Sequence, residues 1–357
     1  MSLTTEIQNV IALAEEFPPD IAELMNAAST VVDAAQTASH DEQKDCLTLL
    51  KTPIAKSHMV VSAIVAVMGG AMVETGADPL ILLDVTLERV RGLMLDVKRY
   101  VEICLEKDLD PNTSMDDLGS DYPREVDSWQ SFNYIYRAII AMTSRSKIGR
   151  SQLAADNDLV KSFAALQEYG EGAIWLYKMA RVLDDEDLIV LHPTLQKGYH
   201  VRISGVADNF QLHTLLADEL IGDAVEGWIP HDSRPSTAVV RIVRGELSEA
   251  HVTAQGFFNL YNWFAIEPDG RLDSEIAGQK QAWIWNEGIP GDIMPFESQR
   301  IILLGEAAYK RTWNAVRIFE AMHPETEVIA QLSDAAVQDW LTKLQEKTIP
   351  ADKLPPQ

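Results

Sequence analysis

Hydrophobic residues recur at helical spacing through the first half of the chain and at strand spacing in several parts of the second half. Between 80 and 104 they alternate at intervals of three and four, which is typical of a helix that packs against another helix. This stripe consists of Leu80, Leu83, Leu87, Val90, Met94, Val97, Val101 and Cys104. Asp78 and Pro79 precede it and are typical of a helix N-terminus. The pattern therefore predicts a helix that begins at 78 and belongs to a bundle.

The rest of residues 1–183 also favours helices. Residues 59–73 are apolar on most sides but too few to span a bilayer, which needs about 20 residues, so we expect a buried central helix. Residues 107–124 are rich in Pro, Gly, Asn and Asp and predict a loop or linker. Helices are expected at 125–143 and 158–183, which completes an all-helical N-terminal domain.

From 184 onward the pattern changes to that of a mixed α/β domain, spanning 184–330. Strands are predicted at 188–192, 200–206, 238–243, 282–285 and 300–304. Helices are predicted from Asp208, where Gln211 has capping-box spacing, and at 307–322. A last amphipathic helix begins at Ser333 and precedes a loose tail, within 331–357. The expected fold class is α+β, a bundle-like helical domain followed by a domain with a mixed sheet.

Charge limits the classes of partner. The 357 residues include 54 acidic and 30 basic side chains, for a formal net charge of -24. Nucleic acid and anionic membranes attract Lys and Arg, so we expect neither as a partner. Two cysteines, Cys46 and Cys104, are too few for a disulfide framework. The N-terminal residues MSLTTEIQNV lack the basic and apolar stretches of a signal peptide, so a cytoplasmic location is expected.

One segment has part of a calcium-loop pattern. Oxygen-bearing side chains occupy positions one, three, five and nine of such a loop, at Asp108, Asp110, Asn112 and Asp116. Thr113 replaces the required glycine, and Gly119 replaces the bidentate glutamate. An ordinary acidic linker is the favoured interpretation. We therefore expect no metal and no cofactor.

Candidate acid–base chemistry is limited to a few residues. His213 lies on the first turns of the helix that Asp208 caps, beside a possible strand-end cleft. Glu287 follows a predicted strand and Arg311 lies in a predicted helix, so the two charges are expected to pair across a gap. The ordinary alternative for each residue is a structural role in the core or on the surface.

Aromatic and amide side chains recur together in three C-terminal segments. Such groups suit sugars, bases or peptides, although tryptophans also fill cores and asparagines bind loop backbone. The candidate ligand-binding residues are Asn262, Trp263, Trp283, Trp285, Asn286, Trp313 and Asn314. Trp283 and Trp285, two positions apart, are expected to share one face of a strand.

Three functions remain open on this evidence. The favoured one is an interaction protein whose helical half binds a protein partner and whose C-terminal domain holds a ligand in an aromatic cleft. The second is an enzyme that uses His213, Glu287 and Arg311. The third is a structural subunit of a homo-oligomer.

Overall fold

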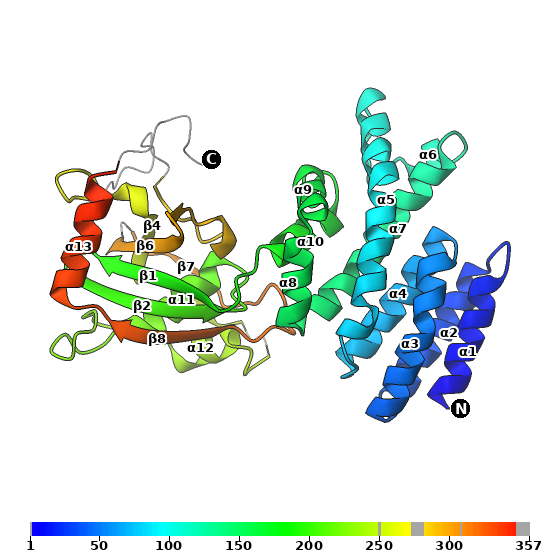
Figure 1. Ribbon diagram of the computed structural model, residues 1–357, viewed down its shortest axis with the longest axis horizontal. Helices are drawn as coiled ribbons and strands as arrows, with labels where there is room; N and C mark the ends of the chain where they lie inside the picture. The colour runs from blue at the N-terminus through cyan, green and yellow to red at the C-terminus, as the bar shows by residue number, and fades with distance from the viewer. Residues whose placement is uncertain (1, 249–250, 273–281, 308, 348–357) are drawn as a thin grey trace. The chain divides into compact units, whose positions relative to one another are not determined.

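The computed structural model describes residues 2–248, 251–272, 282–307 and 309–347, and the chain divides into two compact units, Met1–Ala180 and Arg181–Gln357 (Figure 1). The first unit is entirely helical in its described part, and the second combines helices with a mixed sheet. The predicted fold class is therefore confirmed. No helix among the described residues is both long and apolar enough to cross a membrane.

The helical unit contains ten helices in its described part. Its elements are α1 Leu3–Glu15, α2 Ile21–Ala35, α3 His40–Lys56, α4 Met59–Glu74, α5 Leu80–Glu106, α6 Met115–Leu118, α7 Pro123–Ser144, α8 Lys147–Ala155, α9 Asn157–Leu166 and α10 Glu171–Ala180. Side chains of Ser2, Asp20 and Ser39 accept hydrogen bonds from backbone N–H groups at the starts of α1, α2 and α3. These caps satisfy donors that have no partner inside the helix.

Helix α4 forms the core of this unit, as its all-round hydrophobicity predicts. It packs against α2, α3 and α7. Gly70 lets α7 approach closely, because a Cβ there would lie 2.8 Å from the Cα of Ala138. Helix α5 buries its predicted stripe from Leu83 to Cys104 against α3 and α7, while Leu80 is half-buried. The helix begins at Leu80 rather than at 78, and the Asp78 carboxylate accepts a hydrogen bond from the Leu80 N–H at 2.9 Å.

Two sequence predictions for this unit need correction. The single helix predicted at 158–183 is wrong, because the chain turns between α9 and α10. Gly170 lies at this turn against the ring of Trp129, where a Cβ would come within 2.8 Å of the indole, so close packing interrupts the helix. The predicted loop at 107–124 contains α6, and the Tyr100 hydroxyl donates to the Pro111 carbonyl at 2.9 Å, which fixes this segment to α5.

The C-terminal unit is organised around a sheet with strand order β4-β6-β1-β2-β8, to which β5 adds by pairing with β6. Strands β1 and β6 are parallel and all other neighbours are antiparallel. A separate two-stranded sheet joins β3 and β7. The strands are β1 Glu186–His192, β2 Lys197–Ser204, β3 Thr253–Gln255, β4 Phe258–Asn262, β5 Pro295–Phe296, β6 Gln299–Glu306, β7 Thr312–Asn314 and β8 Glu325–Gln331.

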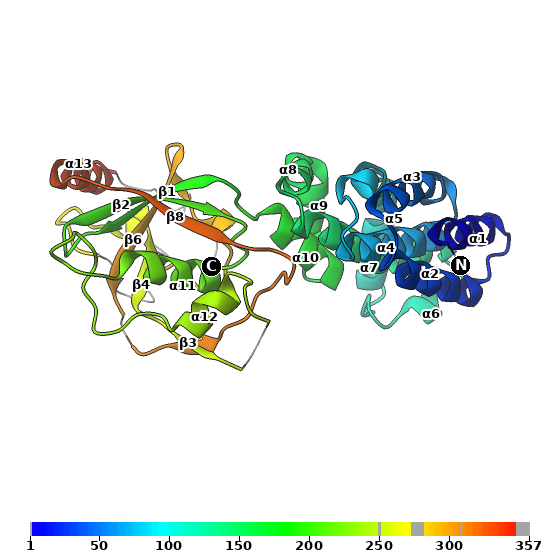
Figure 2. The same ribbon diagram turned by 90° about the horizontal axis from the view of Figure 1, so that it is seen from below.

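Helices cover both faces of the main sheet (Figure 2). Leu188 and Val190 of β1 face a core formed with α11 Asn209–Leu220 and α12 Thr237–Val243. Ile189 and Leu191 face the opposite core, which includes α13 Asp334–Gln345 and the 3-10 turn η1 Trp263–Ala265. Because β1 is buried on both faces, its residues form a continuous apolar run in the sequence rather than an alternating pattern.

Several predicted C-terminal elements have a different structure. The strand predicted at 238–243 is helix α12, which Ser236 caps by accepting from the Val239 N–H. The strand predicted at 282–285 is a single β-bridge, Tyr261 to Trp283. The helix predicted at 307–322 is wrong, since its described part holds β7 and turns, and β8 was not predicted. The capped helix at Asp208 and the helix after Ser333 are confirmed as α11 and α13.

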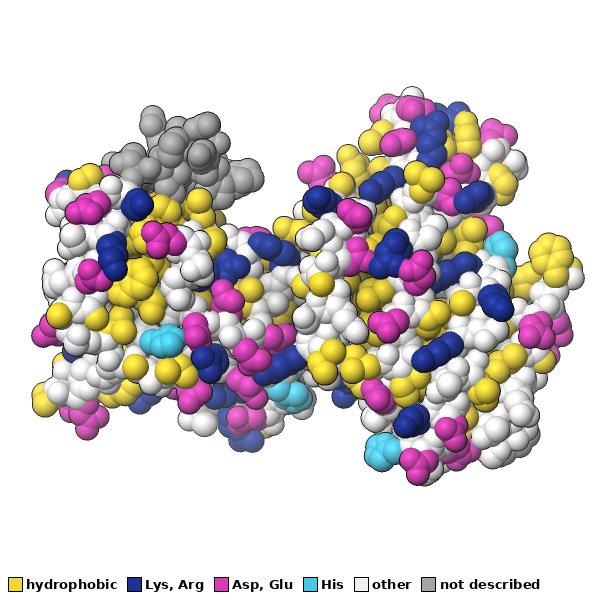
Figure 3. Space-filling view, viewed as in Figure 1, with side chains coloured by type: hydrophobic (Ala, Val, Ile, Leu, Met, Phe, Trp, Pro, Cys, Tyr) yellow, Lys and Arg dark blue, Asp and Glu magenta, His cyan; other side chains and the backbone are white. Residues whose placement is uncertain are grey.

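Acidic and basic side chains alternate over the visible surface of both units (Figure 3). Ion pairs explain part of this mixture: Arg91 binds Asp156 at 2.5 Å and Arg202 binds Asp187 at 2.8 Å. Both signs of charge are therefore intermixed on this face, although the chain as a whole has a net charge of -24.

Burial of the α5 stripe yields a test of the helical unit. Leu87 is buried, whereas Leu95 on the same helix is 78% exposed. We expect Leu87→Asp to lower the free energy of unfolding by about 3 kcal/mol or more, because an unpaired carboxylate enters the core. Urea denaturation measures this loss, with Leu95→Asp as the matched control. Equal stability of the two variants would show that the stripe is not buried.

Candidate functional site

His213 is enclosed in the C-terminal core and faces no solvent. Its side chain is fully buried, and its Nε2 lies 3.1 Å from the Phe258 carbonyl oxygen and 3.3 Å from the Phe257 nitrogen. Burial lowers the pKa of the imidazole to about 3, and the positive charge of Arg311 acts in the same direction. His213 is therefore neutral near pH 7 and fastens α11 to the start of β4.

Arg311 binds the same carbonyl oxygen, since its Nη2 donates to Phe258 at 3.0 Å. Its guanidinium also lies over the ring of Trp283, 5.5 Å from the ring centroid. Burial lowers the pKa of Arg311, while the nearby Tyr309 and Glu287 oppose that shift. Glu287 is exposed, and no ion pair joins it to Arg311 among the described contacts, so the expected direct pair is not present.

Trp283 is the centre of an aromatic cluster at the edge of the sheet. Its ring stacks with that of Tyr261, at 6.4 Å between centroids, and with that of Trp285, at 5.0 Å, and forms a T-shaped pair with Tyr309 at 6.3 Å. Trp285 and Tyr309 are each 52% exposed. No other described aromatic side chain of Phe, Trp or Tyr type in this unit is so exposed. We call the exposed surface formed by Trp285, Tyr309 and Arg311 the Trp285 surface.

Buried polar atoms without a partner surround this cluster. The indole N–H of Trp283, the Nε of Arg311 and the side-chain oxygens of Asn209 and Asn286 have no hydrogen-bond partner among the described residues. The amide nitrogen of Asn209 donates to the Trp285 carbonyl at 2.8 Å, which holds this segment to the start of α11. Because buried polar atoms are nearly always paired, these unpaired atoms distinguish the cluster from an ordinary part of the core.

The remaining predicted ligand-binding residues have structural positions. The side-chain oxygen of Asn262 accepts a hydrogen bond from the Met294 backbone N–H at 3.3 Å. The backbone N–H of Asn262 donates to the Ala282 carbonyl oxygen at 2.7 Å. Trp263 is buried against Phe264 and Phe296. Trp313 packs 5.3 Å from His213, and Asn314 is exposed in β7 opposite Thr253. The structure therefore brings Trp283, Trp285 and Arg311 together. Trp263 instead packs against Phe264 and Phe296, and Trp313 packs beside His213.

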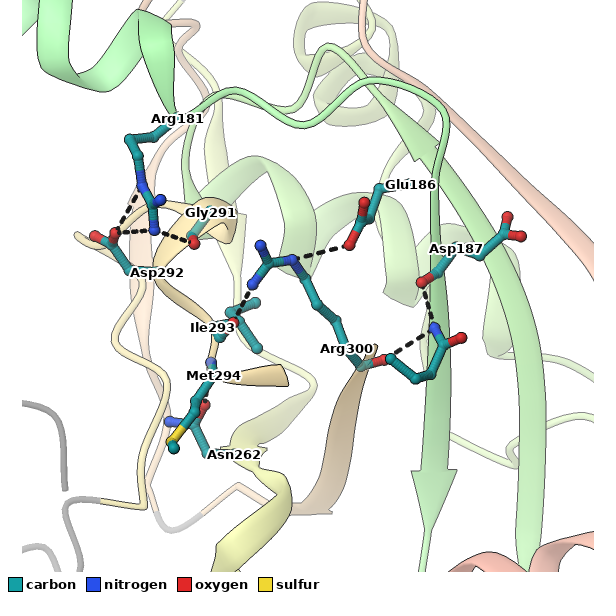
Figure 4. Close-up of polar contacts among 10 residues, drawn as sticks. Arg181, Glu186, Asp187, Asn262, Gly291, Asp292, Ile293, Met294 and Arg300 are labelled. Atoms are coloured by element: carbon teal, nitrogen blue, oxygen red, sulfur yellow. Dashed lines mark hydrogen bonds and ion pairs between the residues drawn. The ribbon is translucent and has the colours of Figure 1, made fainter. Parts of the chain in front are cut away.

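The loop before β5 is held by two arginines (Figure 4). Arg181 binds the carboxylate of Asp292 at 2.9 Å and donates to the Gly291 carbonyl. Arg300 pairs with Glu186 at 3.0 Å and donates to the Ile293 carbonyl. A side chain at position 291 would collide with the carbonyl oxygen of Arg181, so only glycine fits here. Both arginine side chains therefore have a structural role, which is to hold this loop in place.

The acidic segments also serve local structure. The Asp110 carboxylate accepts from the Asn112 N–H at 2.9 Å. In the acidic run at 184–187, Asp184 accepts from the Ser204 hydroxyl at 3.0 Å, and Asp187 pairs with Arg202. The described residues contain no group of three or more His, Cys, Asp or Glu side chains placed to hold a metal ion.

The helical unit carries an apolar groove that the sequence did not single out. Three helices, α2, α4 and α7, form it, with a volume of about 170 Å³. Its apolar lining includes Met25, Val32, Ile64, Val67, Met68 and Tyr134. Met25 and Tyr134 are exposed at the rim, and Met68 is buried at the base. The sequence signal was weak because these residues come from three separate helices.

The neutral state of His213 predicts a pH dependence of stability. An unfolded histidine binds a proton below about pH 6.5, whereas His213 in the folded protein does so only near pH 3. The contribution of His213 to the free energy of unfolding is therefore fully present above about pH 6.5. It decreases as the pH falls below that value, by up to about 1.4 kcal/mol per pH unit. His192, whose pKa burial also lowers, contributes with the same sign.

We expect His213→Gln to flatten the dependence of unfolding free energy on pH between about 6.5 and 5. Chemical denaturation at several pH values measures the slope. The control, His251→Gln, replaces an exposed histidine of the same unit and should keep the wild-type slope. An unchanged slope in His213→Gln would contradict the buried neutral state.

Comparisons with known proteins supply no relative: no family model matches the chain, and neither a curated protein nor a solved structure matches it.

Proposed function

We propose that this protein is an interaction protein and that its α2–α4–α7 groove binds an amphipathic helix of a protein partner. The groove itself is the observation that carries this proposal. Its volume of about 170 Å³ is below the roughly 300–1,000 Å³ of small-molecule sites, so it suits one or two apolar side chains. Apolar grooves between helices commonly accept helical segments through such anchors.

The composition of the groove supports the same function. Methionines at Met25 and Met68 adapt to different side chains because they are flexible and polarizable. Tyr134, at the rim, is of a type enriched among residues that dominate binding energy. The net charge of -24 favours a partner helix that carries Lys or Arg on its polar face. The enzyme alternative has less support, since His213 is buried and neutral.

A photo-crosslinking side chain at position 29, on the groove, identifies the partner in cells of the native host. The purified partner segment is then titrated against variants by fluorescence anisotropy. We expect Tyr134→Ala and Val67→Asp each to weaken binding by at least about 2 kcal/mol, or about 30-fold. Leu95→Ala, an exposed apolar residue on α5, is the matched control and should bind as the parent does.

Two outcomes would overturn this proposal. Crosslinking only to a second copy of the chain would favour the structural subunit of a homo-oligomer instead. If both groove variants bind the partner as tightly as the parent does, the partner does not bind between α2, α4 and α7. Circular dichroism of each variant checks that the helical unit remains folded.

A second binding function is supported by the Trp285 surface. Two half-exposed aromatic rings and a cation converge on Trp283, beside unpaired polar atoms of Asn286 and Arg311. Aromatic rings and arginine are the groups that most often dominate recognition surfaces. We propose that a sugar or an aromatic-containing peptide binds here.

Ligand-observed NMR with panels of soluble oligosaccharides and aromatic peptides tests this surface. We expect Trp285→Ala and Tyr309→Ala each to weaken binding of the selected ligand about tenfold or more, because stacking area is lost. Leu195→Ala, a partly exposed residue of the same unit, should have no effect. Unchanged binding in both aromatic variants would exclude the Trp285 surface.

A further inference from the structure

A cavity of about 390 Å³ in the C-terminal unit has a charge opposite to that of the protein. It lies among α11, α12, β3 and β7, and it is lined by Arg234 and Lys310 but by no acidic side chain. In a chain with 54 acidic and 30 basic residues, a lining with two cations and no acid is unusual. None of the candidate residues predicted from the sequence lines this cavity.

Among the described ion pairs, none involves Arg234 or Lys310. Arg234 donates to the backbone carbonyl of Asp218 at 2.6 Å, so its position is fixed without loss of its charge. The carboxylate of Asp218 is bound by Arg244 at 3.2 Å, and so is that of Glu219 at 2.7 Å. Both neighbouring carboxylates therefore pair with Arg244, and neither pairs with Arg234 among the described contacts, although Arg244 compensates only one of their two negative charges.

The base of the cavity is apolar. Val239, Ala254 and Phe257 line it and are nearly fully buried. Thr214, also buried there, donates its hydroxyl to the Phe210 carbonyl at 3.0 Å and keeps its oxygen available as an acceptor. Ligand sites of this size usually combine an apolar lining with a few polar groups that fix orientation.

We propose that this cavity binds an amphipathic carboxylate, with the carboxylate at Arg234 and Lys310 and an apolar group against Val239 and Phe257. A guanidinium binds carboxylates with two parallel hydrogen bonds, and an ammonium adds a second charge. The carboxylate comes either from a free small acid or from the C-terminus of a peptide. This site is in the C-terminal unit and is independent of the α2–α4–α7 groove.

Ligand-observed NMR titrations of the full chain test the proposal with defined probes. The probes are 4-phenylbutyrate, its neutral amide 4-phenylbutyramide, and acetyl-Gly-Phe with either a free or an amidated C-terminus. We expect each acid to bind at least about tenfold more tightly than its amide, and added salt to weaken the acids selectively. Tighter binding of the peptide acid than of phenylbutyrate assigns the natural ligand to a peptide C-terminus, and the reverse assigns it to a free acid.

Variants locate the binding in this cavity. Arg234→Gln and Lys310→Gln remove exposed cations, and each should weaken acid binding about tenfold or more. Thr312→Glu adds a carboxylate to the exposed rim of the cavity and should also weaken the binding of the acids. Lys161→Gln makes the same charge change on an exposed residue of the helical unit and should bind like the parent. Equal binding of acids and amides, absence of binding by every probe, or full binding by all three cavity variants would overturn the proposal.

Discussion

The C-terminal unit depends on β6, a strand that is buried on both faces and hydrogen-bonded along both edges. Its Ile302 and Leu304 face the α11 and α12 layer, while Ile301 and Leu303 face the α13 layer. Strand β1 binds one edge in parallel register, and β4 and β5 bind the other. A strand in this position needs cover on both sides to remove its apolar residues from water. The layers of helices, and hence the positions of α11 and β4, follow from that requirement.

The two ligand sites proposed for this unit share one short segment of chain. Lys310 and Thr312 line the cationic cavity, whereas Arg311 lies over Trp283 and Trp313 packs beside His213. This alternation is what an extended segment produces, because successive side chains point to opposite sides. Pairing of β7 with β3 holds the segment in that conformation. The register of this pairing sets Thr312 opposite Gln255, and both residues line the cavity.

Sequence patterns predicted the long elements and failed on short ones. The α5 stripe and α11 carry enough periodic positions and capping signals to identify a helix. Five of the seven residues of α12, TAVVRIV, are β-branched, yet the Ser236 cap and packing on the sheet make the segment helical. Residues 312–314 become a strand only because β3 pairs with them, which depends on contacts distant in sequence. The groove and the cavity were missed for the same reason, since their lining residues come from separate elements.

Two residues that suggested chemistry in the sequence, His213 and Arg311, instead fasten the edge of the sheet. Phe258 at the start of β4 has its carbonyl oxygen bound by Arg311 and adjacent to His213, two groups that are costly to place away from water. The free-energy cost of burying the imidazole and the guanidinium is offset by their hydrogen bonds to backbone atoms that would otherwise lack a partner. A neutral imidazole enclosed in this way has no route to a substrate proton. The residues that remain free to bind another molecule, such as Met25, Lys310 and Trp285, give no catalytic signature in the sequence. The binding function proposed above rests on these exposed side chains and not on the buried His213.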